Sequence, residues 1–490
     1  MIMRGIIGEK IMEQCYQQLI NGEWTGASNK GKWSVINPAT EEPVIDVPFG
    51  AAEDCRQAIA AAEKAFPSWS AQTPYQRGAI LKSAADSVRR DVEKLSRVTV
   101  TEAGKPLAEA KGEWMVAADI LEWFAEEGKR SYGRTIPSRR ADKRMSVIYQ
   151  PIGVVGVITA WNFPAYNPAR AWAAALAAGC TVVGRASEFT PLTAMHLGEH
   201  LHKAGIPPGV LNLINGDAQA MGQEMLNSPV LRKISFTGSV RVGKLLMDGA
   251  SRTVKRLGLE LGGNAPVLVF PDANIGALAK SSVFTKFRNN GQVCISPQRF
   301  IVHQKVEDQF VSGIAEWSKK LKVGSGLEPD TNVGPLINAK QRDHVAALVD
   351  DAKKGKIEVV TGGKRPDHLP RGYFYEPTVL SGVASTSRVF NEEIFGPVLP
   401  VTSFAEIEEA IKLANQTPYG LAAYVWTDNL KAATYASEKL EFGMIGVNDW
   451  APQSTEAPFG GWKQSGLGCE LGQEGLLEYM DKKLIGVGGL

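Results

Sequence analysis

The sequence predicts an α/β protein with two α/β domains and an extended arm. From about residue 152, short apolar runs rich in β-branched residues alternate with longer amphipathic stretches, and near residue 265 this alternation begins again. Strands that alternate with helices are typical of parallel sheets with right-handed crossovers. The chain of 490 residues also exceeds the length of one ordinary domain.

The elements follow in order along the chain. Residues 16–50 alternate apolar and turn residues, as short strands do, and residues 51–132 have the apolar periodicity of long amphipathic helices. Residues 134–150 are basic and extended. The elements expected after them are a strand at 152–160, a helix at 168–178, a strand at 181–184, a helix at 191–204, and strands at 210–214, 233–236, 256–259, 265–270, 299–302, 358–361 and 398–404. A last strand at 483–487 could pair with 134–150 or with the edge of another subunit.

Composition and charge exclude several classes of function. Hydrophobic residues make up 44% and charged residues 22%, and 54 basic against 52 acidic residues give a net charge of +2. These values fit a globular protein, and they predict no nucleic-acid partner and no membrane-binding face. No apolar run is long enough for a membrane span or a signal peptide, so we expect a cytoplasmic protein whose translation begins at Met1 or Met12.

The cysteines and histidines predict neither disulfides nor a metal site. The five cysteines are scattered and form no C-x-x-C pair, unlike a disulfide framework or a zinc site. His196, His200 and His202 share one predicted helix, but no cysteine or acidic partner completes a ligand set. We therefore expect these histidines to be solvated or packed.

Cys294 is the candidate nucleophile. It lies between a turn at Gly291 and a break at Pro297, with Arg288 and Arg299 on either side in the sequence. A reactive cysteine needs partial exposure and a lowered pKa, which nearby cations provide. Most single cysteines are inert packing residues, so the segment alone leaves both interpretations open.

Three further segments follow predicted strands. Gly238, Ser239 and Gly243 open a helix after one strand, where a phosphate could bind, although the G-x-G-x-x-G pattern is incomplete and a simple turn explains it equally well. Glu260 ends an apolar strand, where burial raises the pKa of a carboxylate and suits it as a general base; a capping or ion-paired Glu is the alternative. Asn162 follows the first parallel strand and could stabilise an oxyanion or cap the next helix.

Taken together, these segments resemble the aldehyde dehydrogenase superfamily. The resemblance is carried in order by residues 103–107, 161–164, 236–243, 260–263, 291–294, 392–397 and 458–466. It spans the chain from about residue 18 to the end. It implies a Rossmann-like cofactor domain (1–130 and 152–262), a catalytic α/β domain (263–470) and a small β oligomerisation arm (131–151 and 471–490). A homodimer or homotetramer is then expected.

The resemblance also implies the catalytic roles. Cys294 attacks an aldehyde carbonyl, and the side-chain amide of Asn162 and the backbone N–H of Cys294 hold the oxyanion. Hydride transfer to a nicotinamide cofactor leaves a thioester, and Glu260 activates the water that hydrolyses it. A cysteine hydrolase is the alternative from another class, but such enzymes usually need a histidine partner, and no histidine neighbours these motifs in the sequence.

The cofactor residues implied are Trp161, Gly238, Ser239, Gly243, Glu393 and Phe395, with residues 185–188 at the adenosine ribose. Glu188 favours NAD, because an acid there bonds the 2′-hydroxyl and repels a 2′-phosphate. Arg185 replaces the family lysine, and its fork could bind a 2′-phosphate, so NADP stays open.

Within the superfamily the chain is most similar to succinate-semialdehyde dehydrogenases and related acid-semialdehyde dehydrogenases. Arg170 and Arg288 then bind the carboxylate or sulfonate tail of the substrate, with Ser454 as a third contact. Alternatively, Arg170 forms an ion pair on the helix surface and Arg288 bonds a loop carbonyl. Both arginines would then be structural, and the enzyme would be a general aldehyde dehydrogenase with no preference for anionic substrates. Ser296 stands where this subfamily often has a second cysteine, and the sequence of residues 294–297 is more similar to that of enzymes for 2-oxoglutarate semialdehyde. The bulky loop at 449–453 leaves a different or branched acidic aldehyde, including a sulfonated one such as sulfolactaldehyde, as a further substrate.

Overall fold

The first of two large sheets forms around the predicted β-branched runs. The structure, a computed structural model, describes residues 16–355 and 357–489; Met1 and Met12 lie outside these residues. The first sheet has eight strands: β1 (Gln18–Ile20), β2 (Glu23–Thr25), β7 (Val154–Ile158), β8 (Thr181–Arg185), β9 (Leu211–Ile214), β10 (Leu231–Thr237), β11 (Arg256–Glu260) and β19 (Gly466–Leu467). Strands β7 to β11 are parallel and lie in the order β11-β10-β7-β8-β9. The order reverses beside β7, which is where ligands of such sheets bind.

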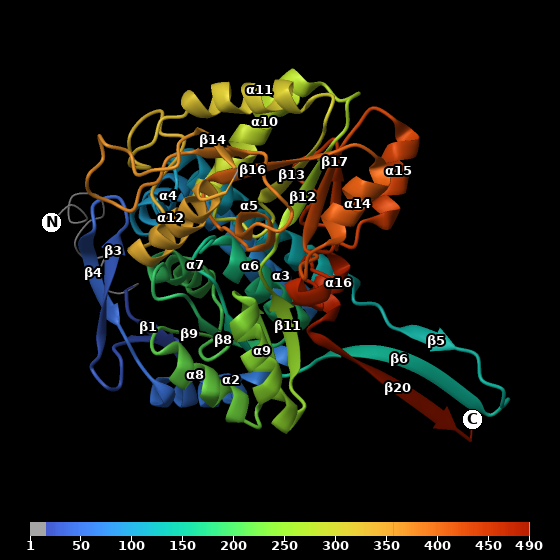
Figure 1. The fold of residues 1–490 in the computed structure, drawn as a ribbon. Helices are drawn as coiled ribbons and strands as arrows, with labels where there is room; N and C mark the ends of the chain where they lie inside the picture. Colours follow the sequence, from blue (N-terminus) through green and yellow to red (C-terminus); the bar gives the residue numbers. More distant parts are fainter. Residues whose placement is uncertain (1–15, 356, 490) are drawn as a thin grey trace.

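Helices cover both faces of this sheet (Figure 1). One face carries α2 (Ala52–Ser70), α8 (Ala218–Asn227) and α9 (Val240–Ala250). The other carries α3 (Pro74–Arg90), α4 (Val92–Ala103), α5 (Leu107–Glu127), α6 (Tyr166–Ala178) and α7 (Pro191–Lys203). Helix α6 is buried on nearly every side, because its alanines let α5, α3 and the sheet approach closely.

The second sheet has seven strands in the order β14-β15-β16-β13-β12-β17-β18. They are β12 (Ala265–Val269), β13 (Pro297–His303), β14 (Glu358–Thr361), β15 (Thr378–Ser381), β16 (Val398–Phe404), β17 (Ala422–Trp426) and β18 (Met444–Val447). Its helices are α10 (Ile275–Phe287), α11 (Glu307–Lys319), α12 (Ala339–Lys353), α13 (Arg388–Asn391), α14 (Ile407–Asn415) and α15 (Leu430–Lys439). The pairing is parallel except for the antiparallel edge strand β14. The α/β prediction is confirmed, whereas β15, β17 and β18 were not predicted.

A three-stranded arm projects from the body (Figure 1). Strand β20 (Met480–Gly488) pairs antiparallel with β6 (Lys143–Pro151), which also pairs with β5 (Arg134–Ile136). The predicted pairing of 483–487 with 134–150 is therefore confirmed. A short helix, α16 (Gly472–Leu477), precedes β20, and β3 (Lys32–Asn37) and β4 (Glu42–Pro48) form a separate hairpin.

The domain limits given above stay predictions. Strand β19 falls inside the range 263–470 but pairs with β11 of the first sheet, and one core cluster contains residues of both sheets. The two sheets are thus packed together around the segment that carries Cys294. None of the helices in the described part of the chain is long and apolar enough to cross a membrane.

Candidate active site

Two cavities meet at Cys294. The large cavity, of about 530 Å³, is lined by Glu109, Gly112, Glu113, Val116, Phe163, Tyr166, Asn167, Arg170, Arg288, Val293, Cys294, Ile295, Gln453, Ser454, Thr455, Glu456 and Phe459. The small cavity, of about 250 Å³, is lined by Ala160, Trp161, Asn162, Asn167, Thr237, Gly238, Ser239, Glu260, Leu261, Gly262, Cys294, Gln341, His344, Glu393 and Phe395. Cys294 and Asn167 line both. The thiol is therefore placed where two ligands could meet.

The turn before Cys294 has an unusual backbone. Asn289 and Asn290 have φ of +47° and +56°, a left-handed conformation that asparagine tolerates better than most residues. The Asn289 side-chain amide donates to the carbonyl oxygens of Asn162 (2.9 Å) and Gln292 (3.1 Å). Gly291 has φ +73°, and a Cβ there would meet the Gly396 carbonyl oxygen at 2.1 Å. The thiol loop is thus fixed to the segment that follows β7.

The pKa of the Cys294 thiol is raised. Burial raises its pKa to about 11, and Arg170 opposes this while Glu260 and Glu393 add to it. The expectation of a pKa lowered by flanking cations is wrong.

Arg299 shows why that expectation fails. Its guanidinium is buried and donates to the carbonyl oxygens of Asn264 (3.0 Å), Leu413 (2.9 Å) and Ala414 (2.7 Å). It therefore secures the second sheet to α14 and does not serve the thiol. Sequence proximity placed this cation beside Cys294, but the side chains of a strand alternate between its two faces.

Glu260 ends β11 in the small cavity. Its side chain is buried, and Oε2 has no hydrogen-bond partner among the described residues. Burial raises its pKa well above the ordinary value, nearby Glu470 raises it further, and Arg170 opposes. The raised pKa that the sequence predicted for this carboxyl group is confirmed.

Arg170 is buried in α6 and is not a helix-surface ion pair. Its Nε lies 2.9 Å from Glu470 Oε2, and its guanidinium carbon lies 4.8 Å and 4.5 Å from the ring centroids of Tyr166 and Phe459. Burial alone would lower the pKa of Arg170, but Glu470 and Tyr166 raise it above its ordinary value. Within the described chain its Nη1 has no hydrogen-bond partner, so this cation retains a free donor at the large cavity.

Arg288 and Ser454 line the same cavity as Arg170. The Arg288 guanidinium is exposed and lies 5.6 Å from the Phe163 ring centroid. No ion pair or hydrogen bond holds it to another residue of the described ranges. The alternative of a structural bond to a loop carbonyl is therefore wrong for this side chain.

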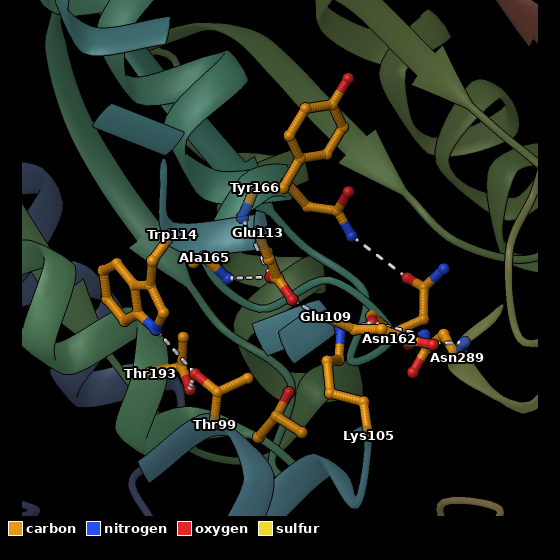
Figure 2. Close-up of polar contacts among 12 residues, drawn as sticks. Thr99, Lys105, Glu109, Glu113, Trp114, Asn162, Ala165, Tyr166, Thr193 and Asn289 are labelled. Atoms are coloured by element: carbon orange, nitrogen blue, oxygen red, sulfur yellow. Dashed lines mark hydrogen bonds and ion pairs between the residues drawn. The ribbon is translucent and has the colours of Figure 1, made fainter. Parts of the chain in front are cut away.

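The loop that carries Asn162 is fixed by a buried ion pair (Figure 2). Lys105 Nζ lies 2.5 Å from Glu113 Oε2 and donates to the Asn162 carbonyl oxygen at 2.8 Å. Glu113 Oε1 accepts the backbone N–H groups of Ala165 (2.7 Å) and Tyr166 (3.2 Å) at the start of α6. A carboxylate at a helix N-terminus also complements the helix dipole. The Asn162 amide is thereby held against the thiol loop, and its Nδ2 donates to the Gln292 carbonyl oxygen at 3.2 Å.

The small cavity lies at the carboxyl end of β10 and the start of α9. Ser239 caps this helix, since its Oγ accepts the Val242 N–H at 3.4 Å. Trp161 packs edge-on against Phe395, with ring centroids 5.5 Å apart. Glu393 Oε1 accepts the Gly263 N–H at 3.0 Å, and burial raises its pKa to about 7. The structure thus gathers the predicted residues Trp161, Gly238, Ser239, Glu393 and Phe395 around one space.

Comparison with known proteins decides the family. The model of the aldehyde dehydrogenase family matches residues 24–485. The chain belongs to the aldehyde dehydrogenase family. A glutarate-semialdehyde dehydrogenase of Pseudomonas putida is 44% identical over 96% of this chain and 97% of its own length. An NADP-dependent succinate-semialdehyde dehydrogenase of Escherichia coli is 43% identical over 96% of this chain and 98% of its own. The structure of a betaine aldehyde dehydrogenase of Staphylococcus aureus in complex with NAD+ has a TM-score of 0.96 at 36% identity and covers 98% of this chain and 96% of its own.

The residues of this aldehyde dehydrogenase fit a nicotinamide cofactor. The start of α9 presents backbone N–H groups that favour a phosphate. At the end of β8, Arg185 Nη2 donates to Glu188 Oε2 and to the Gly216 carbonyl oxygen, both at 2.7 Å. Glu188 is part-exposed beside the second parallel strand, where an acid suits a ribose hydroxyl. Gly243 does not line the small cavity; a Cβ there would meet Leu261 at 2.8 Å, so this glycine serves helix packing.

The loop at 449–453 reaches two cavities of the dehydrogenase, because Gln453 lines the large cavity whereas Trp450 does not. Trp450 packs against Trp426 and Tyr424 at 4.8 Å and 5.1 Å between ring centroids, and its Nε1 donates to Ser281 Oγ at 3.0 Å. Trp450 lines a side cavity of about 370 Å³ that shares Arg288, Val293 and Ile295 with the large cavity. That the bulk of this loop selects the substrate stays a prediction.

Several residues of the dehydrogenase site were not found from the sequence. Glu470 pairs with Arg170 from a segment far along the chain, and no local pattern marks it. Glu109 lines the large cavity, accepts the Asn289 N–H at 2.8 Å, and has a pKa raised to about 7 by burial. Asn167 follows the recognised motif at 161–164, and its nearness to that motif was the one available signal.

Proposed function

We propose that this enzyme oxidises an aldehyde whose tail carries a carboxylate or a sulfonate. The observation that supports it is the large cavity, which has Cys294 at one end and two arginines, Arg170 and Arg288, in its walls with Ser454. Arginine binds carboxylates and sulfonates through paired N–H donors. Two of the relatives described above are named for succinate and glutarate semialdehydes, which are acid semialdehydes.

Chemistry in this proposal begins at Cys294. Its thiolate attacks the aldehyde carbon, and the tetrahedral oxyanion accepts bonds from the Asn162 side-chain amide and the Cys294 backbone N–H. A nicotinamide cofactor held in the small cavity would supply the hydride acceptor, and loss of the hydride leaves an acyl thioester on Cys294. Glu260 then takes a proton from water, and the hydroxide releases the acid and restores the thiol. The raised pKa of Glu260 makes it a stronger base than an exposed carboxylate.

We also propose how the chain holds its cofactor. The residues are Trp161, Gly238, Ser239, Glu393 and Phe395 around the small cavity, with Arg185 and Glu188 at the adenosine ribose. Glu188 favours NAD because its carboxylate repels a 2′-phosphate. Arg185 forms an ion pair with Glu188, so its guanidinium is not free to bind a 2′-phosphate.

The enzyme is proposed to be a homodimer or a homotetramer of the cytoplasm. Strand β20 lies at the edge of the arm and exposes Leu484, Ile485 and Val487, and an open edge of this kind needs a partner. The four described cysteines are free, which suits a reducing compartment. Sedimentation equilibrium of the purified chain measures the assembly directly, and a monomer would contradict the role of the arm.

Reduced-cofactor formation with a panel of aldehydes tests the proposed function. The panel contains succinate semialdehyde, 2-oxoglutarate semialdehyde, a sulfonated aldehyde and a neutral aldehyde of similar length, each with NAD and with NADP. We expect a much higher kcat/KM for one anionic aldehyde. Equal or better use of the neutral aldehyde would reduce the proposal to a general aldehyde dehydrogenase.

A further inference from the structure

We propose that Asn167 is a positioning residue that sets the orientation of the Asn162 amide. In this orientation the N–H groups of Asn162, and not its oxygen, are turned toward the reacting carbonyl. The inference rests on the oxyanion role proposed above for Asn162. It adds a residue that neither touches the reacting atoms nor belongs to the recognised motifs.

Asn167 is buried between the two cavities and bonds to both Asn162 and Arg170. It lies in the first turn of α6, is only 3% exposed, and shares with Cys294 the position between the large and small cavities. Its Nδ2 donates to Asn162 Oδ1 at 3.2 Å, and its Oδ1 accepts from Arg170 Nη2 at 3.2 Å. A chain of bonds therefore runs from the buried guanidinium through Asn167 to Asn162.

The direction of this chain follows from chemistry. A guanidinium has N–H donors and no acceptor, so Asn167 must present its oxygen to Arg170. Its remaining NH₂ group can then only donate, and Asn162 must receive it with Oδ1. The Asn162 NH₂ group is thereby turned to the opposite side, where one N–H bonds the Gln292 carbonyl oxygen at 3.2 Å. The second N–H of that group is left for a developing oxyanion.

The two ends of an amide are nearly equivalent in shape, so without Asn167 only the Gln292 carbonyl oxygen would favour this orientation of Asn162. A flipped amide would place its oxygen against the oxyanion, turning a stabilising contact into a repulsive one. The flipped amide would cost more free energy in this buried site than in water, because an electrostatic contact is stronger where water is excluded. Arg170, which can only donate hydrogen bonds, thus acts through Asn167 on the orientation of the Asn162 amide, which it does not contact.

Arg170 does not need Asn167 to hold its place. The guanidinium is also paired with Glu470 and lies between the rings of Tyr166 and Phe459. Loss of Asn167 should therefore spare the anion site and act on the chemical step.

The test is a double-mutant cycle with Asn167→Met and Asn162→Ala, assayed with a neutral aldehyde so that tail binding plays no part. We expect Asn162→Ala to lower kcat about 100-fold or more, as loss of an oxyanion donor does, and Asn167→Met to lower it about 10-fold with little change in KM. In the double variant, Asn167→Met should add nothing to Asn162→Ala. Asn167→Ser, which cannot overpack, should repeat the loss if the methionine variant folds poorly.

Alkylation of Cys294 by iodoacetamide supplies a readout that a merely structural role would change. This substitution forms no oxyanion, so its rate should be the same in Asn167→Met and in the wild type. A full kcat in Asn167→Met, additive losses in the cycle, or slowed alkylation would each overturn the inference while leaving the role of Asn162 intact. A full kcat in Asn162→Ala would instead overturn that role, and the inference with it.

Discussion

Replacement of Arg288 by methionine tests the anion site with the least risk to the fold. The Arg288 side chain is exposed and has no ion pair or hydrogen bond within the described residues. The methionine gives up the ring contact with Phe163, at 5.6 Å, and the charge interaction by which Arg288 lowers the pKa of Glu109. Arg170 is the less suitable target, because its removal would leave the buried Glu470 without its cation.

The expected loss can be worked from this exposure. A hydrogen bond to a charged group contributes about 1.5 to 3 kcal/mol when it is shielded from water. Solvent and salt reduce this at an exposed arginine, so we expect about 1 to 2 kcal/mol. At 1.36 kcal/mol for each factor of ten, kcat/KM for an anionic aldehyde should fall about 5-fold to 30-fold. Most of this should appear in KM, because the tail lies away from the reacting carbon.

The assay compares the wild type, Arg288→Met and Arg288→Lys with succinate semialdehyde and with a neutral aldehyde of the same length. The lysine variant should be intermediate, because its ammonium keeps the charge but lacks the planar fork. The difference between wild type and Arg288→Met should shrink as salt is raised. Equal losses for neutral and anionic aldehydes, or no loss for any anionic aldehyde, would refute an anion site at Arg288.

Three further outcomes follow from the same contacts. Glu188→Ala should release Arg185 and raise kcat/KM with NADP about 10-fold or more; no gain, or a gain that survives a second change of Arg185 to methionine, would contradict this. The rate of Cys294 alkylation in cofactor-free enzyme should keep rising with pH toward its pKa of about 11, because only the thiolate reacts; a plateau below pH 9 would count against it. Arg170→Met should lower the free energy of unfolding in urea by about 3 to 5 kcal/mol, since a buried carboxylate loses its partner; unchanged stability would show that Arg170 and Glu470 are not a buried pair.

The sequence predicted those parts of the site that lie at the ends of strands. The carboxyl ends of parallel strands meet at one edge of a sheet, so local motifs sufficed to bring Asn162, Glu260 and Gly238 together. Glu470 was missed because its partner Arg170 lies in another part of the chain. The aromatic cluster of Trp450 with Tyr424 and Trp426 was missed for a related reason, because these residues come from separate segments of the chain.

Strand length explains the missed elements of the fold. Strands β15, β17 and β18 contain four or five residues each. An apolar run of that length fits a buried strand, a helix end or a covered loop equally well. Their identity is decided by the neighbours they pair with in the second sheet, which no local pattern contains.

The charges around Cys294 indicate how its thiolate forms during turnover. Arg170 is the one cation that lowers the pKa of the thiol in the described structure, and burial outweighs it. In the proposed function an anionic tail binds to this same arginine and neutralises part of its charge, so Arg170 cannot be the group that activates the thiol. Burial also raises the pKa of Glu260, which makes the carboxylate a better acceptor for the thiol proton. We therefore expect thiolate to form by proton transfer to Glu260 when substrate binds, and Glu260 to pass this proton to solvent before it accepts one from the hydrolytic water. A cofactor-free thiol that already reacts fully at neutral pH would contradict this order.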